Sequence, residues 1–439
     1  MIKKLLLALI CMLPVCAYSQ SAAQLVMEGD DKFNGKDYLG AIKLYTQALT
    51  ANNVWADAYY RRGEADFEMG DYKNAVNDFT SAVVANPRNP EFYNKRGVTK
   101  FQLQDLLGAI SDYNNAIGLD STLSLAYNNR GLAESYLKQY NSAINDYNIA
   151  IKQRTDYSEA FFNRGYALQN INNIKAAVND YDTAIKLRPT FKNAYYNRGM
   201  LNLAAGDNDA AYVDFTKVID LDEGAGDAYL NRGIVKANRK DYQGALLDYK
   251  KAIEINPNSE AAFINKGIAE AAIGKFTVSI TSFEAAIKLN PQDAVAYNYI
   301  GLSKNHLGDF KGAIADCDRA IAINSAFADA YNNRGYAKNQ LKLYTAAVAD
   351  LKISIKLNPR NAIAYLNMGN AAMSLTNYKA ALTYYSEALK IDPIYADAFN
   401  NRGITKYFSG DKTGACSDFK KASALGLKDA IDNLTKYCK

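Results

Sequence analysis

The chain has 439 residues, with 51 Lys and Arg, 46 Asp and Glu and one histidine, so its net charge is +5. A charge this small and this scattered excludes the electrostatic footprint of a nucleic-acid-binding protein. The single histidine excludes a histidine-rich metal site, and no phosphate-binding loop is found in the sequence. We therefore expect a non-enzymatic protein without catalytic residues, metal or cofactor.

The first segment of the chain, residues 1–19, is typical of a cleaved signal peptide. Two lysines precede an apolar run over residues 5–17, and small residues stand at Ala17 and Ser19, where a signal peptidase reads the chain. The run is too short to cross a bilayer. We expect cleavage after Ser19 and export of the remaining chain to the periplasm or the exterior of the cell.

The two cysteines of this segment argue against a lipid anchor. Cys11 follows Ile10 and Cys16 follows Val15, whereas an acylated cysteine needs a small residue before it. We therefore expect an exported protein that is neither lipidated nor inserted in a membrane.

The rest of the chain is built on one repeat of 34 residues. Twelve glycines keep this register without an insertion or deletion, and six of them close the tripeptide Asn-Arg-Gly. The twelve are Gly29, Gly63, Gly97, Gly131, Gly165, Gly199, Gly233, Gly267, Gly301, Gly335, Gly369 and Gly403. A fixed period of this length indicates a solenoid or a propeller.

Each repeat contains two apolar stripes separated by a break. In the fourth, Ala126, Ala133 and Leu137 recur at helical spacing, and Ala143 and Tyr147 begin a second stripe after the break. An Asp or Asn that can cap the second helix stands at the break in nine repeats. These residues are Asp37, Asp71, Asp105, Asn173, Asp207, Asp241, Asp309, Asn377 and Asp411. Each repeat is thus predicted to be helix, turn, helix, turn.

Small and large residues alternate in fixed positions of the repeat. An alanine follows the register glycine by twelve residues in eleven repeats, and an aromatic residue follows it by sixteen in ten. Glycine and alanine let two helix backbones approach closely, and aromatic rings fill the space that remains. The 33 tyrosines are therefore predicted to form the core and not a surface for stacking bases.

The order aromatic, Gly, Ala, aromatic, Ala, Pro at this period resembles the tetratricopeptide repeat over about residues 22–425. The resemblance implies an all-α fold, a right-handed superhelical solenoid over residues 20–426 whose first helices line a concave groove. It also implies a scaffold that binds a protein or peptide partner. The chain departs from the family before the register glycine, where Arg is usual here and Leu is usual in the family.

This arginine is matched by an aspartate sixteen residues later, and we infer an ion pair between the two helices of a repeat. Where the arginine is missing the aspartate is missing too, except that Ile300 stands with Asp316, where Lys304 can substitute. The pairs are Arg62–Asp78, Arg96–Asp112, Arg130–Asp146, Arg164–Asp180, Arg198–Asp214, Arg232–Asp248, Arg334–Asp350 and Arg402–Asp418. Capture of an anionic ligand is the alternative role of these arginines.

An asparagine precedes the arginine position in eight repeats. Because successive residues of a helix differ by about 100°, these amides are predicted to face the groove if the arginines face the partner helix. The row is Asn129, Asn163, Asn197, Asn231, Asn265, Asn333, Asn367 and Asn401. Amides can bind the backbone of an extended peptide, and the alternative is that they bridge successive first helices.

The same groove suggests three functions. The first is docking of a segment of a partner protein, held by the asparagines and by side chains such as Tyr136, Tyr166 and Tyr336. The second is binding of a glycan or peptidoglycan, because aromatic faces with amides also suit sugars. The third is a structural spacer in a cell-envelope assembly, with the groove unused.

The last segment, residues 427–439, is predicted to be an amphipathic helix that caps the solenoid, with an apolar face that includes Ala430 and Ile431. Cys416 and Cys438 lie about 15 and 18 Å from the turn between two antiparallel helices. A disulfide between them is a hypothesis that fits an exported protein. Cys317 occupies a core position and is expected to be buried.

Overall fold

The computed structural model describes residues 21–438, and within them the predicted all-helical repeat is confirmed. The first helices of the repeats are α1 (Ala22–Asn34), α3 (Ala56–Glu68), α5 (Pro90–Gln102), α7 (Ser124–Tyr136), α9 (Ser158–Asn170), α11 (Lys192–Ala204), α13 (Gly226–Asn238), α15 (Glu260–Ala272), α17 (Ala294–Leu307), α19 (Ala328–Gln340), α21 (Ala362–Ser374) and α23 (Ala396–Phe408). The second helices are α2 (Tyr38–Ala51), α4 (Tyr72–Ala85), α6 (Leu106–Leu119), α8 (Tyr140–Gln153), α10 (Ile174–Leu187), α12 (Asn208–Leu221), α14 (Tyr242–Ile255), α16 (Phe276–Leu289), α18 (Phe310–Ile323), α20 (Tyr344–Leu357), α22 (Tyr378–Ile391) and α24 (Lys412–Ala424).

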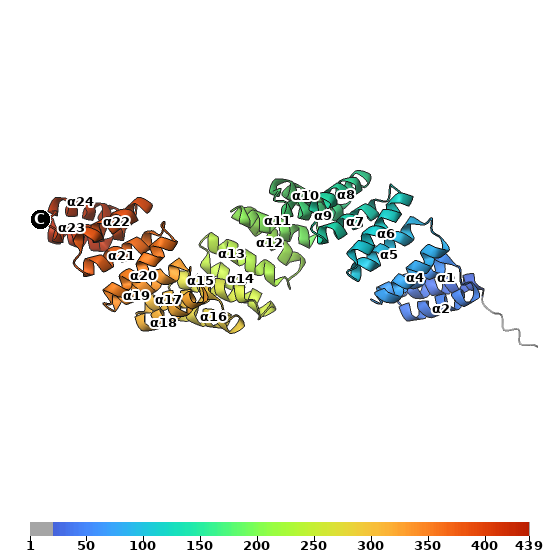
Figure 1. Cartoon of the computed structure of the whole chain (residues 1–439), viewed down its shortest axis with the longest axis horizontal. Coiled ribbons are helices and arrows are strands. Elements are labelled where there is room, and N and C mark those ends of the chain that lie inside the picture. The colour runs from blue at the N-terminus through green and yellow to red at the C-terminus, as the bar shows by residue number, and fades with distance from the viewer. Residues whose placement is uncertain (1–20, 439) are drawn as a thin grey trace, which may run out of the picture. The chain divides into compact units, whose positions relative to one another are not determined.

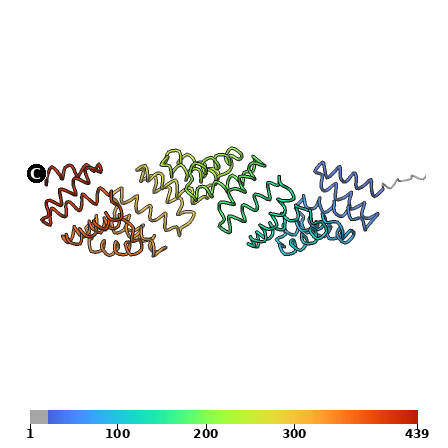
Figure 2. Tube along the Cα trace, turned by 90° about the horizontal axis from the view of Figure 1, so that it is seen from above, coloured from blue at the N-terminus to red at the C-terminus, as the bar shows by residue number. Residues whose placement is uncertain are grey.

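The chain forms two compact units, which divide at residue 198. Within each unit, a first helix packs on the second helix of its own repeat and on the second helix of the repeat before it, as Figures 1 and 2 show. The signal peptide predicted over residues 1–19 lies outside the described residues. The cleavage site therefore remains a prediction.

The turns inside the repeats are built from caps and one left-handed residue. Eight of the nine predicted capping side chains accept the hydrogen bond they were expected to accept, as Asp105 does from the amide of Gly108 at 2.9 Å. Asn173 is the exception, because its side chain makes no such bond. The residue seven after each register glycine has a positive φ, whether it is a glycine such as Gly70 or a residue such as Lys36. This residue reverses the chain between the two helices.

The core follows the alternation of small and large residues. Ala75, Ala109 and their counterparts are fully buried, and the aromatic residue sixteen after the register glycine is at most 1% exposed wherever it occurs. A Cβ atom added to Gly233 would lie 2.5 Å from Cε1 of Tyr249. The glycines therefore set the distance between the two helices of each repeat.

A last helix, α25 (Lys428–Tyr437), covers the end of the second unit. Ala430 is fully buried against α24, whereas Ile431 is 52% exposed, so the apolar face is narrower than predicted. Cys416 and Cys438 are joined by a disulfide with a Cα–Cα distance of 5.6 Å, which ties α25 to α24. Cys317 is a free, buried thiol.

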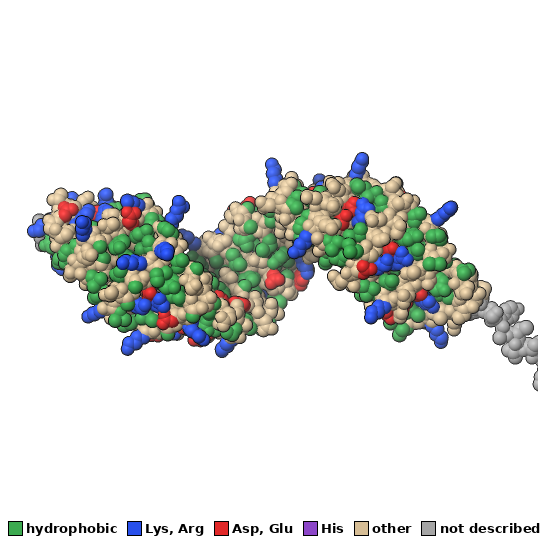
Figure 3. Space-filling model, in the orientation of Figure 1, with side chains coloured by type: hydrophobic (Ala, Val, Ile, Leu, Met, Phe, Trp, Pro, Cys, Tyr) green, Lys and Arg blue, Asp and Glu red, His purple; other side chains and the backbone are tan. Residues whose placement is uncertain are grey.

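The charged side chains are dispersed. On the face that Figure 3 shows, Lys and Arg side chains are scattered among fewer Asp and Glu side chains, and they do not gather into one large patch. This arrangement agrees with the small net charge of the sequence.

Candidate functional site

The arginine before the register glycine and the aspartate sixteen residues later form the same bidentate ion pair in seven repeats. Nε and Nη2 of the arginine each donate to one carboxylate oxygen, at 2.6–2.9 Å. The pairs are Arg62–Asp78, Arg96–Asp112, Arg130–Asp146, Arg164–Asp180, Arg232–Asp248, Arg334–Asp350 and Arg402–Asp418. The aspartate side chains are between 2% and 8% exposed, so each pair is buried on its acidic side.

Two positions are described separately. Nη1 of Arg198 donates to Asp182 at 2.6 Å, and Asp214 is buried and accepts from Asn202. The pairing of Arg198 with Asp214 stays a prediction. In the ninth repeat, which has no arginine, Nζ of Lys304 lies 2.7 Å from Asp316 as expected.

Each of these arginines also joins its repeat to the one before. Nη1 of Arg164, for example, donates to Asn148 of α8 at 2.7 Å, and the guanidinium lies 5.4 Å from the ring of Phe161. Thr46, Thr80 and Asn114 hold the place of Asn148 for the arginines of earlier repeats. These hydrogen bonds and ring contacts within the protein account for the recurrence of the arginine without a ligand.

A lysine joins the buried carboxylate in several repeats. Its Nζ lies 2.7–2.8 Å from the aspartate in Lys100–Asp112, Lys236–Asp248, Lys338–Asp350 and Lys406–Asp418. The fourth repeat instead has Glu134 in this position, next to Asp146. Within the described residues, Oε2 of Glu134 is buried and has no hydrogen-bond partner. Burial and then the charge of Asp146 raise the pKa of Glu134 to about 7.

This carboxyl group gives a testable pH dependence. Its pKa is raised in the folded chain, so the folded state binds the proton more tightly than the unfolded state does. Glu134 therefore destabilises α7 and α8 above pH 7, and this cost disappears as the pH falls from about 7 to the ordinary value of 4.5. Because the side chain is partly solvated, we expect the change to stay below about 1 kcal/mol.

The measurement compares the free energy of opening of α7 and α8, from amide hydrogen exchange, in the wild-type chain and in Glu134→Gln at about pH 4 and about pH 8, which lie on either side of the range in which Glu134 titrates. The glutamine variant should gain stability at the higher pH and show a weaker pH dependence. Parallel changes in both chains would show that Glu134 does not titrate in this range.

The structure corrects the prediction of eight accessible groove amides. Asn231, Asn333 and Asn367 are between 5% and 8% exposed and therefore lie between the layers. Five members of the row donate from Nδ2 to an amide oxygen of the neighbouring first helix, at 2.9–3.1 Å. These bonds are Asn129–Asn94, Asn163–Asn128, Asn333–Asn298, Asn367–Asn332 and Asn401–Asn370. Asn265 donates to the carbonyl oxygen of Ala261 in its own helix.

The bridging amides were predictable only as an alternative, because the partner lies in another repeat. In the first pair, Asn129 donates to Asn94, which is 35 residues earlier and occupies the position next to the row. A pair of asparagines 35 residues apart is therefore the signal of a bridge. Among the predicted residues, Asn163 and Asn197 are half-buried and reach the groove as well as their protein partners.

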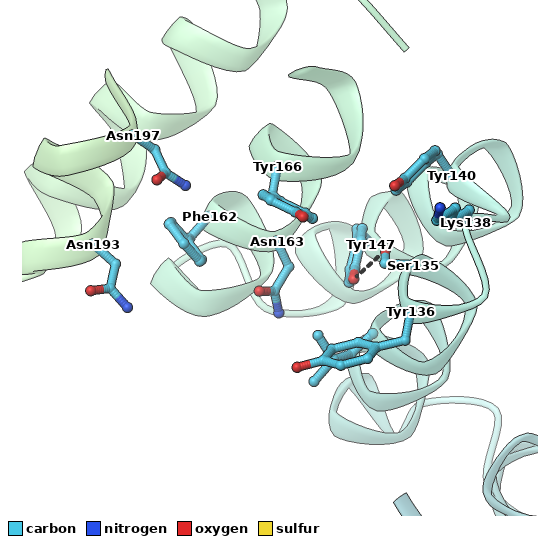
Figure 4. A pocket seen from close by; sticks show the side chains of 11 residues that line it. Ser135, Tyr136, Lys138, Tyr140, Tyr147, Phe162, Asn163, Tyr166, Asn193 and Asn197 are labelled. Atoms are coloured by element: carbon cyan, nitrogen blue, oxygen red, sulfur yellow. Dashed lines mark hydrogen bonds between the residues drawn. The ribbon is translucent and has the colours of Figure 1, made fainter. Parts of the chain in front are cut away.

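These two asparagines line a pocket of about 420 Å³ in the first unit. Tyr136, Phe162 and Tyr166 form its aromatic wall, and the amide side chains of Asn163, Asn193 and Asn197 face the same space from α9 and α11 (Figure 4). Tyr136 and Tyr166 are 59% and 44% exposed, so their rings are available to a ligand. At the floor of the pocket, the hydroxyl groups of Ser135 and Tyr147 are 3.1 Å apart.

A second, more open pocket of about 600 Å³ adjoins the first. The two share Leu132, Phe162, Asn163 and Asn193, so they form one groove across α7, α9 and α11. The further lining residues were not predicted from the sequence. They are Asn128, Arg154, Tyr157, Glu159, Arg188 and Phe191.

Tyr336, which occupies the same repeat position as Tyr166, does not line this groove. It lies in the second unit and packs edge-on against Phe310, with 6.3 Å between the ring centroids. In the range 21–438, no helix has the length and apolarity that a bilayer crossing requires. The same range has no cluster of three His, Cys, Asp or Glu side chains suited to a metal ion.

Comparison with known proteins supports this architecture. Models of the tetratricopeptide repeat match residues 63–104, 164–215, 226–259, 264–332, 328–361 and 362–395, which together are more than half of the chain. No curated protein matches the chain.

Three solved structures illustrate the likeness. The chain is similar to the crystal structure of the APC/C hetero-tetramer Cut9–Hcn1, with a TM-score of 0.55, 14% identity, and coverage of 95% of this chain and 96% of that one. It is similar to a tetratricopeptide repeat protein from Parabacteroides merdae, with a TM-score of 0.48, 18% identity and coverage of 56% and 98%. It is also similar to YrrB, a TPR protein described as having an unusual peptide-binding site, with a TM-score of 0.37, 26% identity and coverage of 42% and 95%. From the matched models and the repeating helical pairs, the chain belongs to the tetratricopeptide repeat family.

Proposed function

We propose that the groove of the first unit, formed by the two adjoining pockets, binds an extended segment of a partner protein. The observation that carries the proposal is the combination of exposed Tyr136 and Tyr166 with the amides of Asn163 and Asn197 around one pocket. Aromatic rings supply apolar contact area, and a few polar groups fix the orientation of a bound chain. The protein acts in this proposal as a non-catalytic interaction scaffold.

The size of the pocket supports a side chain as the ligand. A volume of about 420 Å³ lies near the lower end of the range for small-molecule sites, about 300–1,000 Å³, and accommodates one bulky side chain. The backbone of the segment would then pass the amides, which offer both donors and acceptors. A glycan is the alternative occupant, because the same tyrosines and amides suit a sugar ring.

Selection of displayed random peptides on the full chain tests the proposal. We expect enriched sequences with a bulky apolar or aromatic residue, whose synthetic peptides bind the wild type and lose affinity by about tenfold with Tyr166→Ala/Asn197→Ala. Tyr336→Ala is the matched control, because it changes the same repeat position outside the groove. Absence of any enriched peptide, with retention of soluble peptidoglycan fragments by the wild type, would favour the glycan. Retention of neither would favour the spacer.

We also propose that the chain is exported. The leader-like residues 1–19 and the disulfide between Cys416 and Cys438 both support an oxidising compartment. N-terminal sequencing of the protein from its native cells should begin at Gln20, whereas an intact first segment would contradict the proposal.

A further inference from the structure

The turns between repeats follow a rule that is broken twice. Nine of the eleven turns carry an Asn or Asp at the residue after the second helix, and its side chain accepts the backbone N–H two residues later, at 2.8–3.3 Å. These residues are Asn52, Asn86, Asp120, Asp222, Asn256, Asn290, Asn324, Asn358 and Asp392. The two exceptions are Arg154 and Arg188, which belong to successive repeats and line the same pocket.

The turns at Arg154 and Arg188 lack the stabilising hydrogen bond from a side-chain acceptor to the backbone N–H. A short acceptor side chain closes this kind of turn on its own backbone, and arginine has no acceptor with which to do so. Departures from a rule that the rest of a chain obeys are expected at functional sites. Here both departures fall on the second pocket, beside the groove proposed to hold a partner segment.

Both arginines are held in a similar way. Cζ of Arg154 lies 4.7 Å from the ring centroid of Tyr157, and Cζ of Arg188 lies 3.5 Å from that of Phe191, in each case the aromatic residue three positions on. Contact with a ring restrains the guanidinium while its N–H groups, which point out from its edge, stay available for a carboxylate. The aromatic residues therefore preorganise two cationic donor groups in one pocket.

The present partners of these arginines leave capacity for a ligand. Nε of Arg154 donates to Asp156 at 3.1 Å, but the Asp156 side chain is 75% exposed, so this bridge is weak and easily exchanged. Nη1 of Arg188 donates to Glu159 at 2.6 Å. Among the described residues, Nε of Arg188 is buried without a hydrogen-bond partner. The pocket is thus lined by two cations and one carboxylate, so one positive charge remains for a ligand.

We infer that Arg154 and Arg188 bind an acidic side chain of the partner segment, within a few residues of the apolar side chain that fills the first pocket. The inference rests on the proposed function and adds the charge of the ligand to it. Charge complementarity selects an Asp or Glu, because a planar carboxylate accepts two parallel N–H bonds from a guanidinium. The two pockets share four lining residues and therefore adjoin, so one continuous segment can reach both.

The test uses a variant whose substituted residues are taken from the other turns of this chain. Arg154→Asn/Arg188→Asn installs the residue that most other turns carry, so the variant should fold at least as well as the wild type. Arg239→Asn/Arg319→Asn is the control, because it removes two charges from the second unit, including an arginine that lies 5.0 Å from the ring of Tyr212. The probes are peptides selected from the displayed library, synthesised with amidated C-termini, each with its Asp or Glu kept or changed to the amide.

Peptides selected on the wild type should carry an acidic residue near the apolar one. Loss of that acid, or of both arginines, should weaken binding by about tenfold or more, and the two losses together should weaken it little further. The control variant should bind like the wild type. Tight binding that depends on Tyr166 but not on the acid or the arginines, or losses that simply add, would overturn the inference and leave the proposed function in place. Failure to select any peptide would overturn both.

Discussion

Replacing Asp180 by leucine is expected to destabilise the hairpin of α9 and α10 by about 3 kcal/mol or more. Asp180 accepts from Nε and Nη2 of Arg164 at 2.7 Å each and is 8% exposed. Removal of the carboxylate leaves the guanidinium partly buried, and within residues 21–438 Asn148 is then its one side-chain hydrogen-bond partner. The cost arises from the unpaired charge that stays behind and not from the net value of the pair.

Arg164 and Asp180 are the clearest pair for a double-mutant cycle. The lysine position of this repeat holds Leu168, so no second cation joins the carboxylate. Arg164→Met/Asp180→Leu should recover at least half of the loss, because apolar side chains of similar shape leave no buried charge. Two single losses that add in the double variant would refute the pairing.

Hydrogen exchange of the amides in α9 and α10 is the suitable measurement. Each repeat contacts mainly its neighbours, so a long array need not unfold in one step and a single global value would mix many hairpins. Asp156→Ala serves as the control, because its ion pair with Arg154 is on the surface. That variant should change the free energy of opening by less than about 0.5 kcal/mol.

The ion pairs were predictable because both partners lie in one repeat. Arg164 and Asp180 keep the same separation as six other pairs, and the lysine that replaces the missing arginine of the ninth repeat, Lys304, was identified from its spacing of one helical turn. Pairs within one hairpin depend only on the period and on the reversal of the chain. The disulfide between Cys416 and Cys438 belongs to the same class, since it joins adjacent antiparallel helices.

The contacts of the asparagine row were harder to predict from the sequence, because the partners of these amides come from another repeat. The rotation of 100° per residue separates Asn163 from Arg164 correctly, but it does not show what Asn163 faces. The structure places Asn128 there, from the preceding first helix, at 3.1 Å. The direction in which a side chain leaves its helix therefore predicts whether that side chain is exposed only when the distance to the next helix is known.

The groove could not be located from the repeat itself, because it arises where repeats deviate. Phe162 occupies a position that several repeats fill with asparagine, as Asn128 and Asn332 show. Arg154 and Arg188 likewise replace the acceptor of the other turns. The period predicts the fold from what recurs, whereas the candidate site is found among the residues that do not recur.

Gly233→Ala is expected to destabilise α13 and α14 by about 1–3 kcal/mol, although alanine favours a helix by about 1 kcal/mol over glycine. The added Cβ would lie 2.5 Å from Cε1 and 2.8 Å from Cδ1 of Tyr249, a ring that is 1% exposed and has no room to withdraw. The clash must therefore separate the two helices or shift the ring.

Gly118→Ala gives the opposite sign in the same kind of element. Gly118 lies in α6, and apart from the adjoining backbone of its own helix no atom of the described residues lies within 4 Å of the position that a Cβ would take. We expect this variant to gain about 0.5–1 kcal/mol, because only the helix preference changes. Hydrogen exchange of the two hairpins measures both effects. If Gly233→Ala also stabilised its hairpin, the register glycines would not set the spacing of the helices, and their strict period would need another cause.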